Sequence, residues 1–171
     1  MYSNFFVLEK LNINHVQFRL DYYFSNKEHL ERWHPTTPKE FYTFKYQKNK
    51  INEQLKSINN RESLHFLMVN KEKTKMIGHC NYTKIKGYKC WLGYSISKAF
   101  QGKSLMYEAL KLTNAYIIKN LSIQEIRAGI LPENNRSIRL IKRLDFKYVG
   151  EKDELEINGA TQSYATYLLS T

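Results

Sequence analysis

The residues that first suggest chemistry lie in one segment, Gly93 to Met106, which reads GYSISKAFQGKSLM. An apolar stretch leads into a turn of small and hydrogen-bonding residues, and then into a helical pattern with apolar positions at Leu105, Ala109 and Leu112. A strand that enters a helix through such a turn directs free backbone N–H groups and the positive end of the helix dipole at one point. The segment therefore predicts an anion site that suits a pyrophosphate, although any helix start offers the same donors to water.

A second segment, Arg127 to Phe146, repeats this order of strand, turn and helix. Asn134 suits the N-cap of its helix. Ser137 falls in the first turn, where its hydroxyl could either serve the helix end or reach a ligand.

Together the two segments resemble the acetyl-CoA-binding halves of the GNAT N-acetyltransferases, whose pyrophosphate loop reads Gln/Arg-x-x-Gly-x-Gly/Ala. The run of GYSI, FQGKSLMYEAL and PENNRSIRLIKRLDF is similar to the branch that acetylates the N-terminal residue of ribosomal proteins. The likeness is specific from Trp91 to Gly150, and Trp33-His34-Pro35 resembles a tryptophan–proline element of that branch. The resemblance implies acetyl-CoA as the cofactor, bound by Leu92, Gly93, Tyr94, Ser95, Ile96, Gln101, Gly102, Lys103, Ser104, Leu105, Met106, Asn134, Ser137 and Arg143.

The chain departs from the family pattern at three positions. Ser104 stands where the loop normally has glycine, and Asp145 stands where glycine normally precedes the phenylalanine. Ile141 occupies the position of the tyrosine that protonates the leaving thiolate in many members. A serine is the substitute in the ribosomal-protein branch, so the resemblance assigns the proton donor to Ser137.

The resemblance also implies the other groups that acyl transfer from a thioester to an amine requires. A backbone N–H near Tyr94 or Ser95 would polarise the thioester carbonyl. The branch has a glutamate base one strand beyond the serine; Glu156 is the match, and Glu154, on the same side of an extended chain, is the alternative. The pantetheine arm would lie along 92–96 and take the hydrogen bonds of a neighbouring strand.

The acidity of the acceptor amine favours a protein N-terminus over a lysine. An α-amine has a pKa of about 8 and a lysine about 10.4, so near neutral pH roughly a tenth of α-amines but fewer than about one lysine in a thousand are neutral. Trp33, His34 and Tyr42 are the predicted substrate-binding residues, although aromatic side chains in this segment could equally belong to the core.

Two other functions fit the sequence. An acetyltransferase for a small amine, such as a polyamine or an antibiotic, would need an acidic cleft, and the early helices carry Asp21, Glu28, Glu31 and Glu40. A non-catalytic coenzyme-binding or nucleic-acid-associated module would account for Ser104 and Asp145 in place of glycine.

Composition indicates one domain over residues 1–171, with a sizeable core. The net charge of +11 attracts polyanions such as nucleic acid or the ribosome, but the lysines are scattered and no nucleic-acid-binding motif is recognisable. Cys80 and Cys90 lack the spacing of a zinc site, so we expect no metal and two thiols in the core, in neighbouring strands. Because no long apolar run or signal-like start is present, we expect a cytoplasmic protein without a membrane partner. We expect it to be a monomer or a homodimer.

The elements that must position these residues follow from hydrophobic periodicity and from turn residues. We expect strands at 5–11, 63–70, 75–84, 88–97, 125–131, 146–155 and 163–169, and helices at 15–32, 38–59, 104–120 and 135–144. Early strands followed by strand–helix pairs predict an α+β fold, a mixed sheet with helices on its faces, and the resemblance implies that this fold is of the GNAT type. Its mostly antiparallel mixed sheet would have about seven strands, one splayed parallel pair and helices on both faces.

Overall fold

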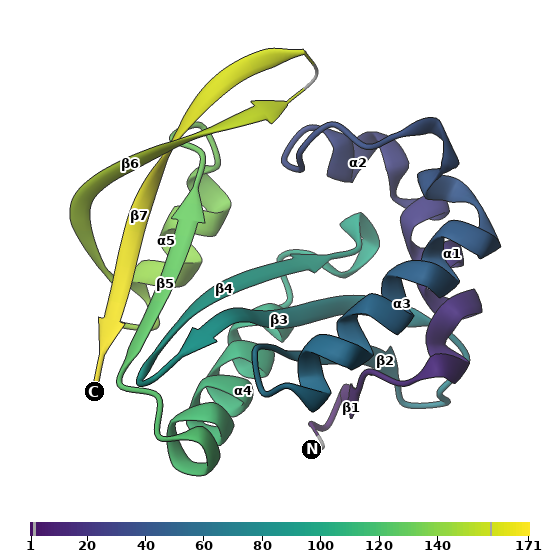
Figure 1. Cartoon of the computed structure of the whole chain (residues 1–171), viewed down its shortest axis with the longest axis horizontal. Coiled ribbons are helices and arrows are strands. Elements are labelled where there is room, and N and C mark those ends of the chain that lie inside the picture. Colours follow the sequence, from purple (N-terminus) through teal and green to yellow (C-terminus); the bar gives the residue numbers. More distant parts are fainter. Residues whose placement is uncertain (2, 158) are drawn as a thin grey trace.

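The computed structural model describes residues 1, 3–157 and 159–171, with side chains for all of these except residues 151–153, 155 and 156. Its described strands form one seven-stranded sheet in the order β1-β2-β3-β4-β5-β7-β6 (Figure 1). The strands are β1 (Phe6–Lys10), β2 (Leu64–Asn70), β3 (Met76–Lys86), β4 (Lys89–Ile96), β5 (Glu125–Ile130), β6 (Lys147–Ile157) and β7 (Ala160–Ser170). Only β4 and β5 run parallel among these neighbours, so the predicted mixed sheet is confirmed.

The described α-helices are α1 (Val16–Ser25), α2 (Lys27–Glu31), α3 (Phe44–Asn59), α4 (Leu105–Leu121) and α5 (Asn135–Lys142). The expected helix over 15–32 breaks at Asn26, whose Nδ2 donates to the Tyr22 carbonyl at 2.8 Å and whose Oδ1 accepts the Lys98 amide at 3.2 Å. The corner between α1 and α2 is therefore tied to the loop after β4. None of the described helices is long and apolar enough to cross a membrane.

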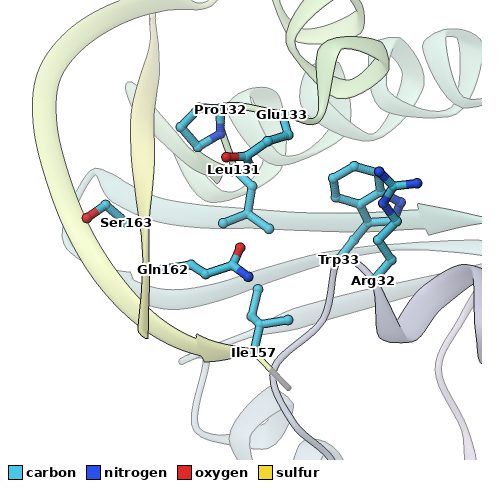
Figure 2. Close-up of a pocket in the computed structure, with 8 residues that line it drawn as sticks. All are labelled: Arg32, Trp33, Leu131, Pro132, Glu133, Ile157, Gln162 and Ser163. Atoms are coloured by element: carbon cyan, nitrogen blue, oxygen red, sulfur yellow. The ribbon is translucent and has the colours of Figure 1, made fainter. Parts of the chain in front are cut away.

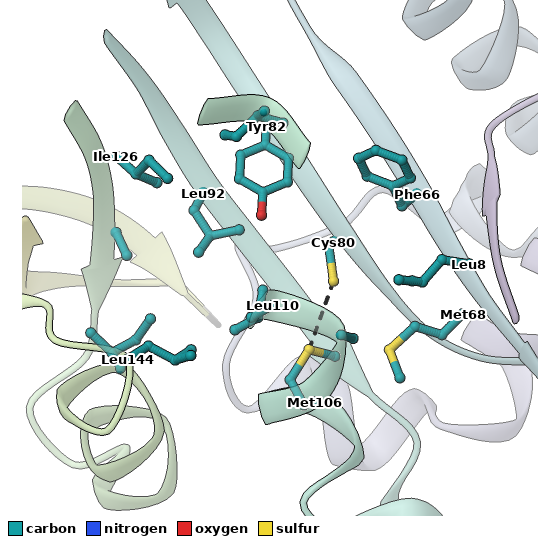
Figure 3. Close-up of a cluster of buried hydrophobic side chains, with 14 of the residues drawn as sticks. Leu8, Phe66, Met68, Cys80, Tyr82, Leu92, Met106, Leu110, Ile126 and Leu144 are labelled. Atoms are coloured by element: carbon teal, nitrogen blue, oxygen red, sulfur yellow. Dashed lines mark hydrogen bonds between the residues drawn. The ribbon is translucent and has the colours of Figure 1, made fainter. Parts of the chain in front are cut away.

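Two apolar cores hold the helices to the two faces of the sheet. On one face, α4 and α5 pack against the central strands through residues such as Met106 and Leu110 (Figure 3). Cys80 of β3 and Cys90 of β4 lie in this core as buried free thiols in neighbouring strands, as the sequence predicts. A smaller core on the opposite face joins α1 and α3 to the first two strands.

The parallel strands β4 and β5 separate along their length, as Figure 1 shows. Their pairing joins residues 89–91 to residues 125–127, although β4 continues to Ile96 and β5 to Ile130. The predicted splayed pair is therefore present. Within the described residues, the segment 92–96 has no strand paired to it on the β5 side.

Candidate active site between β4 and β5

The loop between β4 and α4 presents free amides at the start of a long helix. The first helical hydrogen bond of α4 joins the Glu108 amide to the Ser104 carbonyl at 3.1 Å, so the preceding amides of this turn have no carbonyl inside the helix. Gly102 and Ser104 adopt left-handed backbone conformations, with φ values of 76° and 56°. The donors lie where the sequence predicts a pyrophosphate, and the helix dipole favours an anion there.

Both departures from the family glycines fall at positive φ. Ser104 stands directly before α4, and Asp145, with φ of 65°, follows α5. The Asp145 amide donates to the Lys142 carbonyl at 3.1 Å. The next amide, of Phe146, donates to the Ile141 carbonyl at 3.2 Å, which completes a Schellman motif. A residue with a Cβ costs roughly 1–2 kcal/mol in this conformation, which is why glycine suits both positions.

A polar network ties the loop to helices on both sides of it. Gln101 Oε1 accepts from Arg136 Nη1, in the first turn of α5, at 2.6 Å. Gln101 Nε2 lies 2.8 Å from His29 Nε2 of α2. Burial, and then the positive charges of Lys98 and Arg136, lower the pKa of His29, so its neutral ring can accept from Gln101. Arg136 is a cation beside the loop that was not among the residues predicted to bind the cofactor. The one sequence signal for it was its position at the start of the second helix.

The start of α5 separates a capping side chain from a catalytic candidate. Asn134 Oδ1 accepts the Ser137 amide at 3.2 Å, so Asn134 is the N-cap, as predicted. The Ser137 hydroxyl pairs instead with the hydroxyl of Tyr94, which comes from β4. The predicted proton donor therefore lies next to the unpaired half of β4, and its hydroxyl is not used as a cap.

The unpaired half of β4 is held from both faces of the sheet. Tyr94 reaches toward α5, and burial raises the pKa of its hydroxyl. On the opposite face, Ser95 Oγ lies 2.8 Å from Tyr22 Oη and 2.7 Å from His79 Nε2, in a buried chain of hydrogen bonds. These contacts fix the strand that carries the predicted oxyanion donors.

A cavity of about 480 Å³ opens between the end of α2, the end of β5 and the β6–β7 hairpin (Figure 2). Figure 2 shows Trp33 across the opening from Leu131 and Gln162. The segment 131–133 runs directly into the cap of α5, so the cavity adjoins the turn that carries Ser137. The described lining consists of Arg32, Trp33, Leu131, Pro132, Glu133, Ile157, Gln162 and Ser163.

The three predicted substrate-binding residues have different surroundings. Trp33 lines the cavity, with the Arg32 guanidinium 4.9 Å from its ring centre. His34 is half-buried, and this burial lowers the pKa of His34 to about 4, so its ring is neutral at neutral pH. Tyr42 is not part of the described lining; its hydroxyl donates to Glu31 Oε1 at 3.1 Å. Of the three, Trp33 has the placement that a substrate wall requires.

The predicted base falls in a part of β6 where side chains are not described. The backbone of Glu156 pairs with Thr161 of β7, and its side chain lies outside the described ones. Glu154, the alternative, is exposed and pairs with Ser163. Ile157 is buried and lines the cavity. The assignment of the base to Glu156 stays a prediction.

The remaining predicted cofactor residues divide into core and surface side chains. Leu105 and Met106 are buried in the core, so they offer only their amides to a ligand. Lys103 is exposed within the loop. The Arg143 guanidinium lies 4.5 Å from the ring centre of Tyr107 in α4. The two cations therefore lie near the start of α4, where phosphate charge is expected.

Comparison with known proteins agrees with this geometry. The chain matches the family described as acetyltransferase (GNAT) domain over residues 6–147. The ribosomal protein uS5-alanine N-acetyltransferase of Escherichia coli K12 is 33% identical over 158 residues, which cover 88% of this chain and 80% of that protein. The structure of the ribosomal-protein-S5-alanine acetyltransferase of Vibrio fischeri aligns with a TM-score of 0.93 at 22% identity, over 99% of this chain and 95% of that one. The spermidine N-acetyltransferase of Vibrio cholerae, solved with CoA and spermine, aligns with a TM-score of 0.81 at 19% identity, over 96% and 95%.

At these identities the two solved structures establish the fold. The family match spans most of the chain and includes the loop before α4 and the turn before α5. The chain therefore belongs to the GNAT acetyltransferases, the enzymes that transfer an acetyl group from acetyl-CoA to an amine.

Proposed function

We propose that this enzyme acetylates the α-amine of a protein N-terminus, and that the preferred acceptor is a ribosomal protein. The Escherichia coli relative at 33% identity is named for an alanine of ribosomal protein uS5, and this likeness supports the same class of acceptor. The net charge of +11 agrees with a partner rich in nucleic acid. The same proposal puts the enzyme in the cytoplasm, where ribosomes are assembled.

The charge of the cavity lining is the observation that carries the choice of acceptor. Among the described lining residues, Glu133 is the one carboxylate and Arg32 the one guanidinium, and the proposed base Glu156 would add one further carboxylate. A polyamine carries several positive charges and needs several carboxylates around it. An N-terminal residue presents one ammonium group on a neutral backbone, which suits this lining.

The carboxylates of the early helices do not supply an acidic cleft. Glu31 accepts from a tyrosine hydroxyl, and Asp21 accepts from Gln17 at 2.7 Å. Glu28 and Glu40 are exposed, and none of the four lines the described part of the cavity. The small-amine alternative therefore loses the feature that favoured it.

The chain also carries groups that fit the phosphates of acetyl-CoA. The amides at the start of α4 need an acceptor, and Lys103 within the loop and Arg136 beside it add positive charge. We assign the pyrophosphate to this turn. The pantetheine arm would then follow the unpaired segment 92–96 toward Ser137.

In the proposed reaction, the neutral amine attacks the thioester carbon, so that a C–N bond forms and the C–S bond breaks. An amide near Tyr94 or Ser95 would donate to the developing oxyanion. Glu156 would take the proton that the amine loses, and Ser137 would provide the proton that the thiolate gains. Both side chains return to their starting states by exchange with solvent, so the proton count balances.

An acceptor panel tests this proposal. The enzyme would be given acetyl-CoA with peptides that begin with alanine or serine, with the same peptides blocked at the α-amine, and with spermidine and an aminoglycoside. We expect release of CoA thiol with the free peptides alone. Transfer to spermidine or the aminoglycoside, but not to the peptides, would overturn the proposal.

A matched pair of variants tests the cavity as the acceptor site. Trp33→Ala removes a lining ring, whereas Phe24→Ala removes an aromatic side chain of α1 that is 69% exposed and not part of the described lining. We expect Trp33→Ala to raise the peptide KM by about tenfold or more, with acetyl-CoA affinity kept within about twofold. Phe24→Ala should change neither quantity. Equal KM values for the two variants would remove the cavity from acceptor binding.

A further inference from the structure

The Tyr94 side chain connects the unpaired half of β4 to the first turn of α5. Tyr94 packs against the same core as Leu92, while Ser95 faces the opposite side of the sheet. The backbone of this segment thus faces the space between β4 and β5. The Tyr94 side chain extends on the α5 face of the sheet, and its hydroxyl reaches Ser137. Tyr94 and Ser137 lie 43 residues apart in the sequence, and their pairing depends on the fold.

The surroundings of the two hydroxyls favour one direction for the hydrogen bond. A phenol is a stronger donor than an alkyl alcohol, because its proton is more acidic. The Ser137 carbonyl, at 3.5 Å from Tyr94 Oη, lies at the limit of a hydrogen bond, so the nearer Ser137 Oγ is the better acceptor for the phenol proton. The Ser137 amide is already bound by Asn134, so the cap fixes the backbone and leaves the hydroxyl free to turn. With Tyr94 as donor, the proton of Ser137 stays available to a ligand.

Burial keeps the phenol in its donor form. The low-dielectric surroundings raise the pKa of Tyr94, so it stays protonated throughout the pH range in which a neutral amine can react. The position of the usual family tyrosine is taken by Ile141, which is fully buried in the core and has no proton to give. The chain thus has a phenol at this turn, but it comes from the strand.

We propose that Tyr94 is a positioning residue, which donates to Ser137 Oγ and so directs the Ser137 proton toward the sulfur of coenzyme A. The proposal rests on the proposed function of Ser137 as the donor to the leaving thiolate. Ser137, not Tyr94, faces the sulfur, and Tyr94 acts on it through this hydrogen bond. It removes the alternative rotamer in which Ser137 would donate to a protein acceptor.

Tyr94→Phe tests the role while keeping the ring in the core. We expect kcat to fall by about tenfold, with acetyl-CoA affinity and the acceptor KM within about twofold. In a Ser137→Ala background, Tyr94→Phe should cause no further loss, because the hydroxyl it orients is gone. The matched control is Tyr82→Phe, which removes another buried hydroxyl, bound to Thr113 Oγ1 at 2.7 Å and Asn114 Oδ1 at 2.6 Å. This control should lower the Tm and leave kcat unchanged.

A titration of bound coenzyme A provides a readout that needs no acceptor. The thiolate absorbs in the ultraviolet, so the pKa of the bound thiol can be followed directly. A donor at the sulfur lowers this pKa, and we expect it to rise in Tyr94→Phe and in Ser137→Ala alike. If the acceptor class is wrong, the titration still reports on the hydroxyl pair. Wild-type kcat and an unchanged thiol pKa in Tyr94→Phe would overturn the role. So would a double variant in which Tyr94→Phe lowers kcat by the same factor as it does in the presence of Ser137.

Discussion

Asn134 and Ser137 could each, from the sequence alone, either cap α5 or contact the ligand. Asn134 caps α5, and the Ser137 hydroxyl pairs with Tyr94 across the gap. The identity of both residues could be predicted, because an Asn-rich helix start has a local signature. The partner of Ser137 could not be predicted, because Tyr94 belongs to a different strand.

Ser137→Ala is expected to lower kcat by roughly 10²–10⁴, the usual range for a positioned acid, while acetyl-CoA affinity stays within a few fold. The change removes the proposed proton donor, whereas the cap of α5 remains. Steady-state kinetics and calorimetric titration on one preparation measure both quantities.

Asn134→Ala is the control for this change. It removes the cap and should lower the free energy of unfolding by about 1 kcal/mol. Wild-type turnover in Ser137→Ala would remove Ser137 from the mechanism and leave solvent or the substrate ammonium as the proton source.

Gly102→Asp is expected to weaken acetyl-CoA binding by at least about tenfold, because it places a carboxylate beside the predicted pyrophosphate. An added Cβ at Gly102 meets no atom within 4 Å, so the loss would come from charge and from φ of 76°. Gly102→Asn separates these causes, since asparagine tolerates this backbone and is neutral. Equal affinities of the Asp and Asn variants, measured by calorimetry, would move the pyrophosphate elsewhere.

At the scale of elements, the two lost glycines mark where helices begin and end. Ser104 precedes α4 and Asp145 follows α5, both with positive φ. The sequence identified both as departures, and the backbone conformation explains why glycine is usual there. Ser104 and Asp145 both adopt the left-handed conformation without being glycine. We therefore expect these two substitutions to change the stability of the fold more than its shape.

Asp145→Gly is therefore expected to raise the free energy of unfolding by about 1 kcal/mol, through relief of the left-handed conformation and removal of a negative charge from a helix C-terminus. Urea denaturation measures the change. Asp145→Asn should gain a smaller amount, because it removes only the charge. A Gly variant less stable than wild type would show that the Asp145 side chain stabilises this turn.

Most elements could be predicted from the sequence, because strands, turns and the later helices have local signals. The break at Asn26 could not, since it depends on a hydrogen bond to the distant Lys98 amide. The hairpin of β6 and β7 is longer than predicted, with β7 beginning at Ala160. Pairing along the partner strand extends it beyond the apolar run that the sequence shows.

At the scale of the whole molecule, the site is assembled from segments far apart in the chain. Gln101 and His29 meet although 72 residues separate them, and Trp33 faces the end of β5. The motifs suggested the acetyl-CoA-binding residues from two short segments, and this assignment stays a prediction. They could not predict Arg136 beside Gln101, or Tyr42 outside the cavity lining, because those placements depend on tertiary packing.

Folding also holds imidazole rings neutral, which makes stability depend on pH. The pKa of His34 is lowered to about 4, and burial also lowers the pKa of His79. In the unfolded chain these groups bind protons below about pH 6.5, whereas in the folded chain they do not until the pH is much lower. The contribution of these two neutral rings to the free energy of unfolding is therefore fully present near neutral pH. It is lost as the pH falls below about 6.5.

His34→Gln should reduce this loss, because glutamine keeps a polar side chain but binds no proton. We expect the drop in unfolding free energy between neutral pH and pH 5 to be smaller than in wild type by about 1 kcal/mol, allowing for partial exposure of the ring. Urea denaturation at both pH values measures it. Parallel pH profiles for the two proteins would show that His34 does not titrate in this window.

The position of the transferred acetyl group tests the central claim most directly. The enzyme would be given acetyl-CoA and the N-terminal peptide of ribosomal protein uS5, with a free α-amine and an internal lysine, and the product would be mapped by tandem mass spectrometry. We predict one acetyl group, on the α-amine, and none on the lysine. Acetyl on the lysine alone, or no transfer to the peptide while spermidine is acetylated under the same conditions, would contradict the account.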